Sequence, residues 1–295
     1  MMKVNLSGTG VALVTPFHKY GTIDFSALNR LLQHVIEGGV DYLVVMGTTG
    51  ESVTLSKDEK TALIQYVVEV TEKRVPIVLG IGGNNTQELV NTIKTTDFEG
   101  ISAILSVSPY YNKPQQQGIF HHFKTLAAAS PLPMILYNVP GRTASNMTAQ
   151  TTLSLAREVD NIIGIKEASG NLVQIMDIIR NKPKDFLVIS GDDILTFPLM
   201  TLGADGVISV VANTCPQEFS SMVRLAKEGN TSAARDIHYR LAPFINELFA
   251  DGSPSGIKAA LEIMGICENN LRLPLVKVEK HVYQKLNELI KSLKA

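Results

Sequence analysis

Eight short runs of apolar and β-branched residues recur along the chain, and each is followed by a stretch with helical periodicity. The runs are hydrophobic throughout rather than alternating, which is typical of parallel strands buried on both faces. Eight β-α units in about 225 residues predict an α/β fold, the (β/α)8 TIM barrel, whose active site lies at the carboxyl ends of the strands. An open doubly wound sheet is the alternative, but no glycine-rich nucleotide-binding motif with a downstream acidic residue supports it. The runs cover residues 10–15, 42–46, 77–81, 101–107, 134–138, 162–166, 187–190 and 206–210.

The repeating pattern ends near residue 228. A polar segment, Glu-Gly-Asn-Thr at 228–231, interrupts it, and no strand-like run follows. Helical patterns cover residues 232–249, 255–264 and 275–293, with Gly, Asn and Pro between them. The chain of 295 residues, 45% of them hydrophobic, is large enough for a barrel with an appendage. We therefore predict a catalytic barrel over residues 1–228 and a small C-terminal three-helix region over residues 229–295.

The composition argues against several classes of partner. Lys and Arg total 27 against 28 Asp and Glu, and the absence of a basic run argues against nucleic acid. Residues 1–8 lack the apolar core of an export signal, and no stretch approaches the roughly 18 apolar residues of a membrane span. Cys215 and Cys267 are too few for a disulfide framework, which favours a reducing compartment. We expect a cytoplasmic protein that binds neither nucleic acid nor membrane.

Metal chemistry is disfavoured. None of the six histidines has the spacing of a metal-ligand motif, and the adjacent His121 and His122 would point to different sides of a helix. Asp192 and Asp193 have the chemistry of cation ligands, but helix capping is the favoured role. We therefore expect no metal and no cofactor, and a zinc-dependent aldolase is disfavoured.

Lys166 is the most informative single residue, because it stands where an apolar strand ends and a Ser/Gly turn begins. Burial penalises the charged form of an amine and lowers its pKa, which makes the amine available as a nucleophile. With a pKa near 10.4, only about one free lysine in a few thousand is neutral at pH 7. A lysine facing inward at a strand end predicts Schiff-base chemistry on a carbonyl substrate. A surface lysine paired with Glu167 explains this segment alone equally well.

Other polar residues follow predicted strands and converge on one mouth if the chain forms a barrel. Thr48 and Thr49, in a glycine-flanked turn, can hold a carboxylate through hydroxyl and backbone N–H groups. The phenol of Tyr137 can move a proton, and Arg142 can clamp a carboxylate. Each has an ordinary alternative: a capped turn, a packing tyrosine and a solvated arginine. Together they suit small carbonyl compounds that carry carboxylates.

Five segments stand out by their order and spacing. They are GTTGES at 47–52, SPYYNKP at 108–114, YNVPGRT at 137–143, GIKEASG at 164–170 and SGDD at 190–193. Together they resemble the dihydrodipicolinate synthase family, within the N-acetylneuraminate lyase superfamily of class I aldolases. The resemblance covers essentially the whole chain, including the helical tail. It implies a homo-oligomeric lyase that condenses pyruvate with L-aspartate-4-semialdehyde and closes the ring, the committed step of diaminopimelate and lysine biosynthesis.

The resemblance assigns roles to individual residues. Lys166 would form the Schiff base with pyruvate, and Tyr137 would stabilise and protonate that adduct. Thr49 would link Tyr137 to Tyr111, which would reach across from the neighbouring subunit of a tight dimer. The remaining pocket residues would bind substrates. Thr48 and Thr49 would hold the pyruvate carboxylate, and Arg142 would bind the carboxylate of the semialdehyde. Gly191 and Ile208 would line the pocket with backbone groups.

Two alternatives to the synthase remain. One is a pyruvate-dependent lyase of the same superfamily acting on sialic acid or a 2-keto-3-deoxy sugar acid. Sialic-acid lyases resemble this chain in fold but usually carry Ser-Thr in the first motif, and a Leu/Ser/Gly-type segment in the loop after the strand tyrosine. At these positions this chain has Thr48-Thr49 and Gly141-Arg142-Thr143. The other is a barrel whose site has decayed into a carboxylate sensor or scaffold, and the intact set of site residues argues against it.

One departure from the family pattern concerns regulation. Family members that are inhibited by lysine resemble this chain but have histidines at the positions of Lys57 and Lys60, near an allosteric pocket. Two positive charges oppose a cationic effector, and Val53 takes up space where some members have alanine. We predict weak or absent feedback inhibition by lysine.

Overall fold

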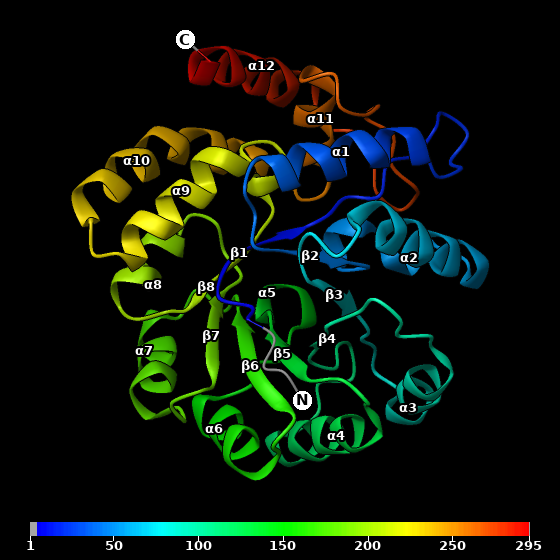
Figure 1. Ribbon diagram of the computed structural model, residues 1–295, viewed down its shortest axis with the longest axis vertical. Coiled ribbons are helices and arrows are strands. Elements are labelled where there is room, and N and C mark those ends of the chain that lie inside the picture. Colours follow the sequence, from blue (N-terminus) through cyan, green and yellow to red (C-terminus); the bar gives the residue numbers. More distant parts are fainter. Residues whose placement is uncertain (1–4, 295) are drawn as a thin grey trace.

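The computed structural model describes residues 5–294. Eight parallel strands follow one another around a closed barrel, and helices lie outside it (Figure 1). The fold predicted from the eight apolar runs is confirmed. Residues 1–4 lie outside the described part of the chain. They are half of the segment 1–8, in which the sequence predicts no export signal. The strands are β1 (Gly8–Ala12), β2 (Tyr42–Val45), β3 (Ile77–Gly80), β4 (Ala103–Val107), β5 (Met134–Asn138), β6 (Ile162–Glu167), β7 (Leu187–Ser190) and β8 (Gly206–Ser209).

Each strand is followed by at least one helix. Side-chain caps begin two of them: Asp24 accepts the Ala27 N–H at the start of the first α-helix, and Ser56 forms a capping box with Glu59 at the start of the second. The barrel helices are α1 (Phe25–Glu37), η1 (Thr48–Gly50), η2 (Ser52–Thr54), α2 (Lys57–Thr71), α3 (Thr86–Thr95), α4 (Gln116–Ala129), α5 (Pro140–Thr143), α6 (Ala149–Glu158), α7 (Leu172–Asn181), α8 (Thr196–Thr201), η3 (Val211–Asn213) and α9 (Pro216–Lys227).

The barrel closes where β1 pairs with β8. Gly8 lies opposite Gly206, and a Cβ atom on Gly206 would stand 2.1 Å from the Gly8 carbonyl oxygen. Only glycine fits at this contact, because any side chain would overlap backbone atoms. The first strand begins two residues earlier than predicted and ends at Ala12, so residues 13–15 leave the barrel as a loop.

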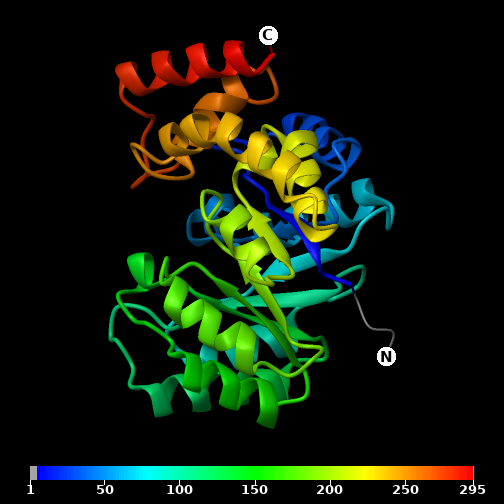
Figure 2. The same ribbon diagram turned by 90° about the vertical axis from the view of Figure 1, so that its left-hand side faces the viewer.

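Three further helices follow the barrel and pack at one end of the molecule (Figure 2). They are α10 (Thr231–Leu248), α11 (Ser255–Ile263) and α12 (Lys280–Lys294). The last begins five residues later than predicted, after an irregular stretch with a turn at Pro274. The boundary predicted at residue 228 falls between α9 and α10, and the division into two domains stays a prediction.

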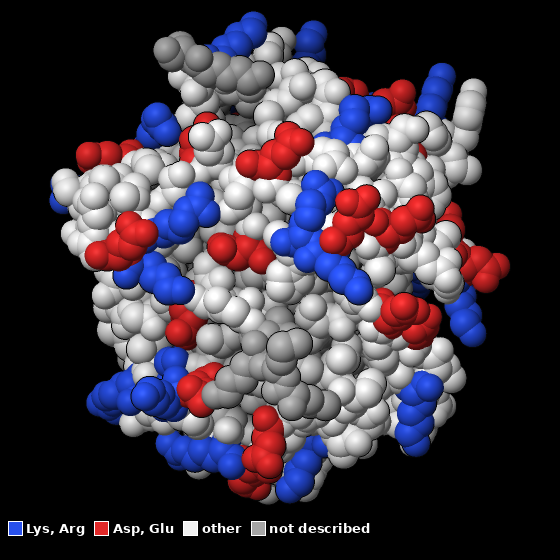
Figure 3. All heavy atoms as spheres, viewed as in Figure 1, with Lys and Arg blue, Asp and Glu red and all other residues white. Residues whose placement is uncertain are grey.

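The core has two layers. Small and apolar side chains from the inward faces of the strands, among them Val44, Val78 and Ile135, fill the barrel interior. A larger cluster, with Leu31, Phe123 and Phe219, lies between the strands and the surrounding helices. Basic and acidic side chains are interspersed on the face shown in Figure 3. No helix in residues 5–294 is both long and apolar enough to cross a membrane.

Candidate active site

Strand β6 delivers Lys166 into the mouth of the barrel. Alternate residues of a strand face opposite sides, so Ile165 packs outward against the helices while Lys166 lines a cavity of about 1790 Å³. Lys166 is 6% exposed, and its Nζ atom lies 4.4 Å from the ring centroid of Tyr137. The two residues are register partners on neighbouring strands, so the barrel itself fixes their proximity.

The environment of Lys166 favours the neutral amine. Burial lowers its pKa to about 8; the negative charge of Asp193 opposes this shift, and the positive charge of Arg142 adds to it. With a pKa of about 8, roughly one amine in ten is neutral at pH 7, against one in a few thousand for a free lysine. The structure therefore provides the nucleophile that Schiff-base formation needs.

Glu167 faces the opposite side of the strand and is not the partner of Lys166. Its Oε1 accepts the Ser169 N–H at 2.8 Å, and its Oε2 accepts from Gln174 Nε2 at 3.1 Å. The Nδ2 atom of Asn138 donates to both carboxylate oxygens, at 3.1 and 3.2 Å. The surface ion pair that explained the sequence equally well is therefore excluded, and Glu167 instead ties together the loops that follow β5 and β6.

The turn after β2 places Thr48 and Thr49 on the cavity wall. The two threonines begin η1, and a hydrogen bond from Thr15 Oγ1 to the Gly50 carbonyl, 2.7 Å, holds the end of that turn. Gly80 lets the turn approach closely, since a Cβ atom there would stand 2.4 Å from the Met46 carbonyl oxygen. Hydroxyl and backbone N–H groups of such a turn suit a carboxylate.

Tyr137 and Arg142 come from β5 and the short helix α5 that follows it. Burial raises the pKa of Tyr137 to about 12, with the Arg142 charge acting in the opposite direction, so the phenol keeps its proton at neutral pH. Arg142 lines the same cavity, and its Nη2 donates to the Ser253 carbonyl at 3.3 Å. Ser253 lies between α10 and α11, so the C-terminal region contributes to the site.

Gly191 gives the Lys166 side chain its space. A Cβ atom at this position would stand 2.9 Å from Lys166 Cε and 2.8 Å from Ala168 Cβ. Gly191 also lines the cavity. The structure therefore brings together six of the predicted site residues: Thr48, Thr49, Tyr137, Arg142, Lys166 and Gly191.

Two predicted residues, Tyr111 and Ile208, do not line this cavity in the single chain. Tyr111 follows β4, is 87% exposed and has a left-handed φ of 72°. Ile208 is 1% exposed and packs with Tyr137 in the barrel interior. A non-glycine residue held in the left-handed region is strained, and such strain accompanies functional loops. The role of Tyr111 across a dimer stays a prediction.

Asp193 is a site residue whose role the sequence did not reveal. Asp192 Oδ1 accepts the Ile194 N–H at 3.2 Å in the turn before α8, but α8 begins after Leu195 without a side-chain cap, so the capping role predicted for the pair is wrong for Asp193. Its Oδ2 instead accepts the N–H groups of Val210 and Val211, at 3.0 and 3.1 Å, and so fixes the loop after β8. Burial raises the pKa of Asp193 to about 6. Among residues 5–294, no cluster of three His, Cys, Asp or Glu side chains could hold a metal ion.

Comparison with known proteins identifies the family. The model of the Dihydrodipicolinate synthetase family matches residues 5–293. The chain belongs to this family. A Parabacteroides distasonis relative named 4-hydroxy-tetrahydrodipicolinate synthase is 55% identical over 293 residues, which cover 99% of both chains. The resemblance found in the five sequence segments is therefore confirmed over almost the whole chain.

Solved structures of the family agree with this assignment. The dihydrodipicolinate synthase of Acinetobacter baumannii, described as chloride-inhibited and solved with pyruvate, is 39% identical and superposes with a TM-score of 0.95, covering 98% of this chain and 99% of that one. The enzyme of Cyanidioschyzon merolae, solved with lysine bound, is 40% identical, also with a TM-score of 0.95 and 99% coverage of both chains. Both the fold and the C-terminal helices are thus shared with enzymes of this family.

Proposed function

We propose that this chain is a 4-hydroxy-tetrahydrodipicolinate synthase, which condenses pyruvate with L-aspartate-4-semialdehyde through a Schiff base on Lys166. The observation that carries the proposal is the buried amine of Lys166 beside Tyr137 in a cavity that also presents Thr48, Thr49 and Arg142. A neutral amine, a protonated phenol and a guanidinium are the three groups that this condensation needs. The reaction is of the class I aldolase type and requires no cofactor, because the amine itself activates the keto acid.

The first half-reaction uses Lys166 and Tyr137. The Nζ lone pair adds to C2 of pyruvate, and Tyr137 donates a proton to the carbinolamine oxygen, which leaves as water. The resulting iminium loses a proton from C3 and becomes an enamine. Hydroxyl and backbone N–H groups of Thr48 and Thr49 hold the pyruvate carboxylate during these steps.

The second half-reaction forms the carbon–carbon bond. The enamine carbon attacks the aldehyde carbon of the semialdehyde, whose carboxylate pairs with Arg142. The amino group of the semialdehyde then attacks C2, displaces Lys166 and closes the ring. Backbone groups of Gly191 and Ile208 complete the pocket in this proposal.

Tyr111 is assigned to a proton relay with Thr49 and Tyr137. Its side chain is 87% exposed on the single chain, which suits a residue that completes the site of a second copy. We therefore propose a homo-oligomer built from tight dimers, in which each subunit supplies its Tyr111 to its neighbour. This arrangement also explains why a tyrosine tolerates a left-handed backbone at an exposed loop.

A substrate comparison tests the proposed function. Incubation with pyruvate and borohydride should add the mass of one reduced pyruvate per chain, and turnover should occur with aspartate semialdehyde but not with sialic acid or 2-keto-3-deoxy sugar acids. Arg142→Ala should still trap pyruvate while losing use of the semialdehyde by about 100-fold, because a charge-assisted carboxylate contact is lost. Turnover of sugar acids in place of the semialdehyde would assign the chain to the other branch of the superfamily, and no adduct at all would indicate a scaffold.

Feedback by lysine should be weak. Lys57 and Lys60 line the cavity together with Glu88 and Tyr110, and Val53 is 85% exposed beside them. Steady-state titration should show little loss of activity at 1 mM lysine, on the order of 10%, because two ammonium groups oppose a cationic effector. Lys57→Ala/Lys60→Ala should bind lysine more tightly than the parent chain. Strong inhibition at submillimolar lysine contradicts the prediction.

A further inference from the structure

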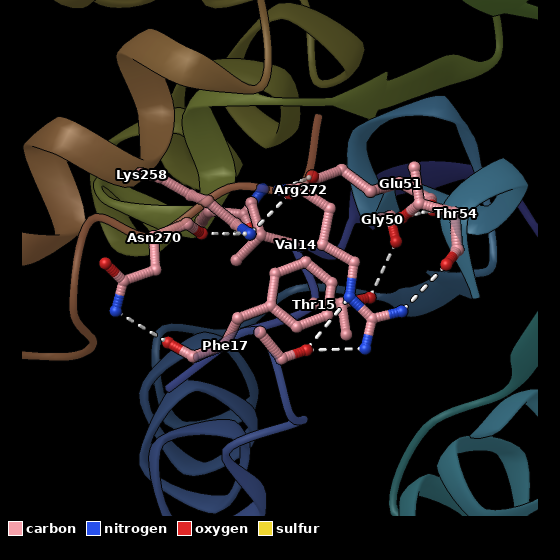
Figure 4. Close-up of polar contacts among 11 residues, drawn as sticks. Val14, Thr15, Phe17, Gly50, Glu51, Thr54, Lys258, Asn270 and Arg272 are labelled. Atoms are coloured by element: carbon pink, nitrogen blue, oxygen red, sulfur yellow. Dashed lines mark hydrogen bonds and ion pairs between the residues drawn. The ribbon is translucent and has the colours of Figure 1, made fainter. Parts of the chain in front are cut away.

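A second buried lysine lies outside the cavity, in the C-terminal region. Lys258 of α11 pairs with Glu51 across 2.5 Å, and neither side chain has any solvent exposure. Its ammonium also donates to the Asn270 carbonyl at 2.8 Å and lies 4.1 Å from the ring centroid of Phe17 (Figure 4). A charged group in such a place requires a full set of partners, and Lys258 has them.

Glu51 is held from its other side by the segment before α12. Its Oε2 accepts the backbone N–H of Arg272 at 3.0 Å. The Arg272 guanidinium donates to the Thr54 carbonyl at 2.7 Å and pairs with Glu59 at the start of α2. Its Cζ atom lies 4.5 Å from the Phe17 ring centroid, and Figure 4 shows the side chain beside that ring. The C-terminal region therefore contacts both ends of the segment that runs from η1 to α2, at Glu51 and at Glu59.

The segment from η1 to α2 begins with the turn that is proposed to bind the carboxylate. Glu51 follows Thr49 by two residues and has a left-handed φ of 51°, so its backbone sets the direction of the chain between η1 and η2. Glutamate does not favour this conformation, and other contacts must impose it. Backbone hydrogen bonds of Glu51 with Thr48 and Thr54 hold this conformation, and the Lys258 and Arg272 contacts to the Glu51 carboxylate add to them.

Stability alone does not account for this arrangement. Desolvation of two charges offsets most of their attraction, and a buried ion pair is commonly no more stable than apolar side chains of the same size. Buried pairs can, however, specify one arrangement of the chain over others. A pair that joins α11 to the turn beside Thr49 fixes that arrangement at the place where pyruvate binds.

We propose that Lys258 and Arg272 are positioning residues for pyruvate. Lys258 and the Arg272 backbone N–H hold Glu51, and the Arg272 guanidinium holds Thr54 and Glu59. Together these contacts keep the Thr48–Thr49 turn in the geometry that receives the substrate carboxylate. The inference rests on the proposed function and extends it to a region that does not touch the substrate. A displacement of about 1 Å in a group that positions a substrate can lower the efficiency of its reaction about 10- to 100-fold. The expected defect is therefore in pyruvate binding rather than in the use of the semialdehyde.

The test measures pyruvate half-saturation by mass spectrometry of the borohydride-trapped adduct, together with the KM for semialdehyde. Lys258→Met and Glu51→Gln should raise the pyruvate half-saturation at least 10-fold, while the maximal trapped fraction and the semialdehyde KM change less than 3-fold. Lys182→Met is the matched control. Lys182 also donates to one carbonyl, of Phe186, and one carboxylate, of Asp205, but at the amino end of β7.

The outcomes separate positioning from stability. The control should lower the melting temperature without changing pyruvate half-saturation. If Lys258→Met and Glu51→Gln fold and keep parental half-saturation, or if the control changes it equally, the inference is wrong. If both fail to fold, Arg272→Lys decides by the same criterion, because its side chain is 19% exposed and the variant keeps a cation. A parent chain that traps no pyruvate would instead refute the proposed function.

Discussion

Lys166→Ala should reduce kcat/KM at least about 10⁴-fold and abolish the pyruvate adduct, because the nucleophile of the covalent route is gone. Two observations support this size of effect: among the lysines that line the cavity, Lys166 has its Nζ beside the Tyr137 ring, and Gly191 leaves room for its side chain. Activity assays with pyruvate and semialdehyde measure the loss, and mass spectrometry of the borohydride-treated chain measures the adduct.

The second buried lysine provides an internal control. Lys258 is even more buried than Lys166, 0% against 6% exposed, but its ammonium is paired with Glu51 and it does not line the cavity. Peptide mapping of the trapped protein should find the adduct on Lys166 and none on Lys258. An adduct that survives in Lys166→Ala contradicts the assignment of the nucleophile.

The same reaction should depend on pH in a defined direction. The neutral amine is the reactive form, and its share grows as the pH rises toward the lowered pKa of Lys166, about 8. The initial rate of adduct formation should rise nearly tenfold per pH unit between about pH 6 and 7.5 and level off above pH 8. A rate that keeps rising to pH 10 would indicate a lysine with its ordinary pKa.

Tyr137→Phe should lower kcat by about 10²- to 10³-fold, the range of a lost general acid. The phenol keeps its proton at neutral pH because burial raises its pKa to about 12, so it can supply a proton but is a poor base at rest. Phenylalanine keeps the ring that packs 4.4 Å from the Lys166 amine. The variant should therefore still bind pyruvate, but form its adduct slowly.

Tyr42→Phe is the matched control for this variant. Tyr42 is also buried in the barrel interior, where its hydroxyl donates to the Val207 carbonyl at 3.2 Å. Its loss should cost about 1 kcal/mol of folding free energy and leave kcat within 2-fold of the parent. Equal loss of activity in both variants would mean that barrel packing, rather than proton transfer, explains the effect of Tyr137→Phe.

The fold was predictable because parallel strands buried on both faces leave a strong pattern. Strands β5 and β7 have the predicted limits, and β6 differs by one residue. The predicted strands run too far where apolar residues continue beyond the hydrogen-bonded strand, as after β1. They stop short where the strand continues into a polar residue, as at Glu167 of β6. Hydrophobicity marks burial, and a buried loop carries the same signal as a strand end.

The candidate site was predictable where it is built from strand ends, because barrel topology brings those ends together. Lys166, Tyr137 and the Thr48–Thr49 turn were found in this way. Contacts between distant segments left no such pattern. The Lys258–Glu51 pair joins positions 207 residues apart, and the only signal was a lysine within the apolar helix α11.

The closing seam of the barrel has a consequence for biosynthesis. Gly8 and Gly206 are partners, yet about 200 positions separate them, so β1 leaves the ribosome long before its second neighbour exists. At roughly 5–20 residues per second, that interval is on the order of 10 to 40 seconds. Throughout it the nascent chain presents β1 as an open strand edge, which is exposed to mispairing before release.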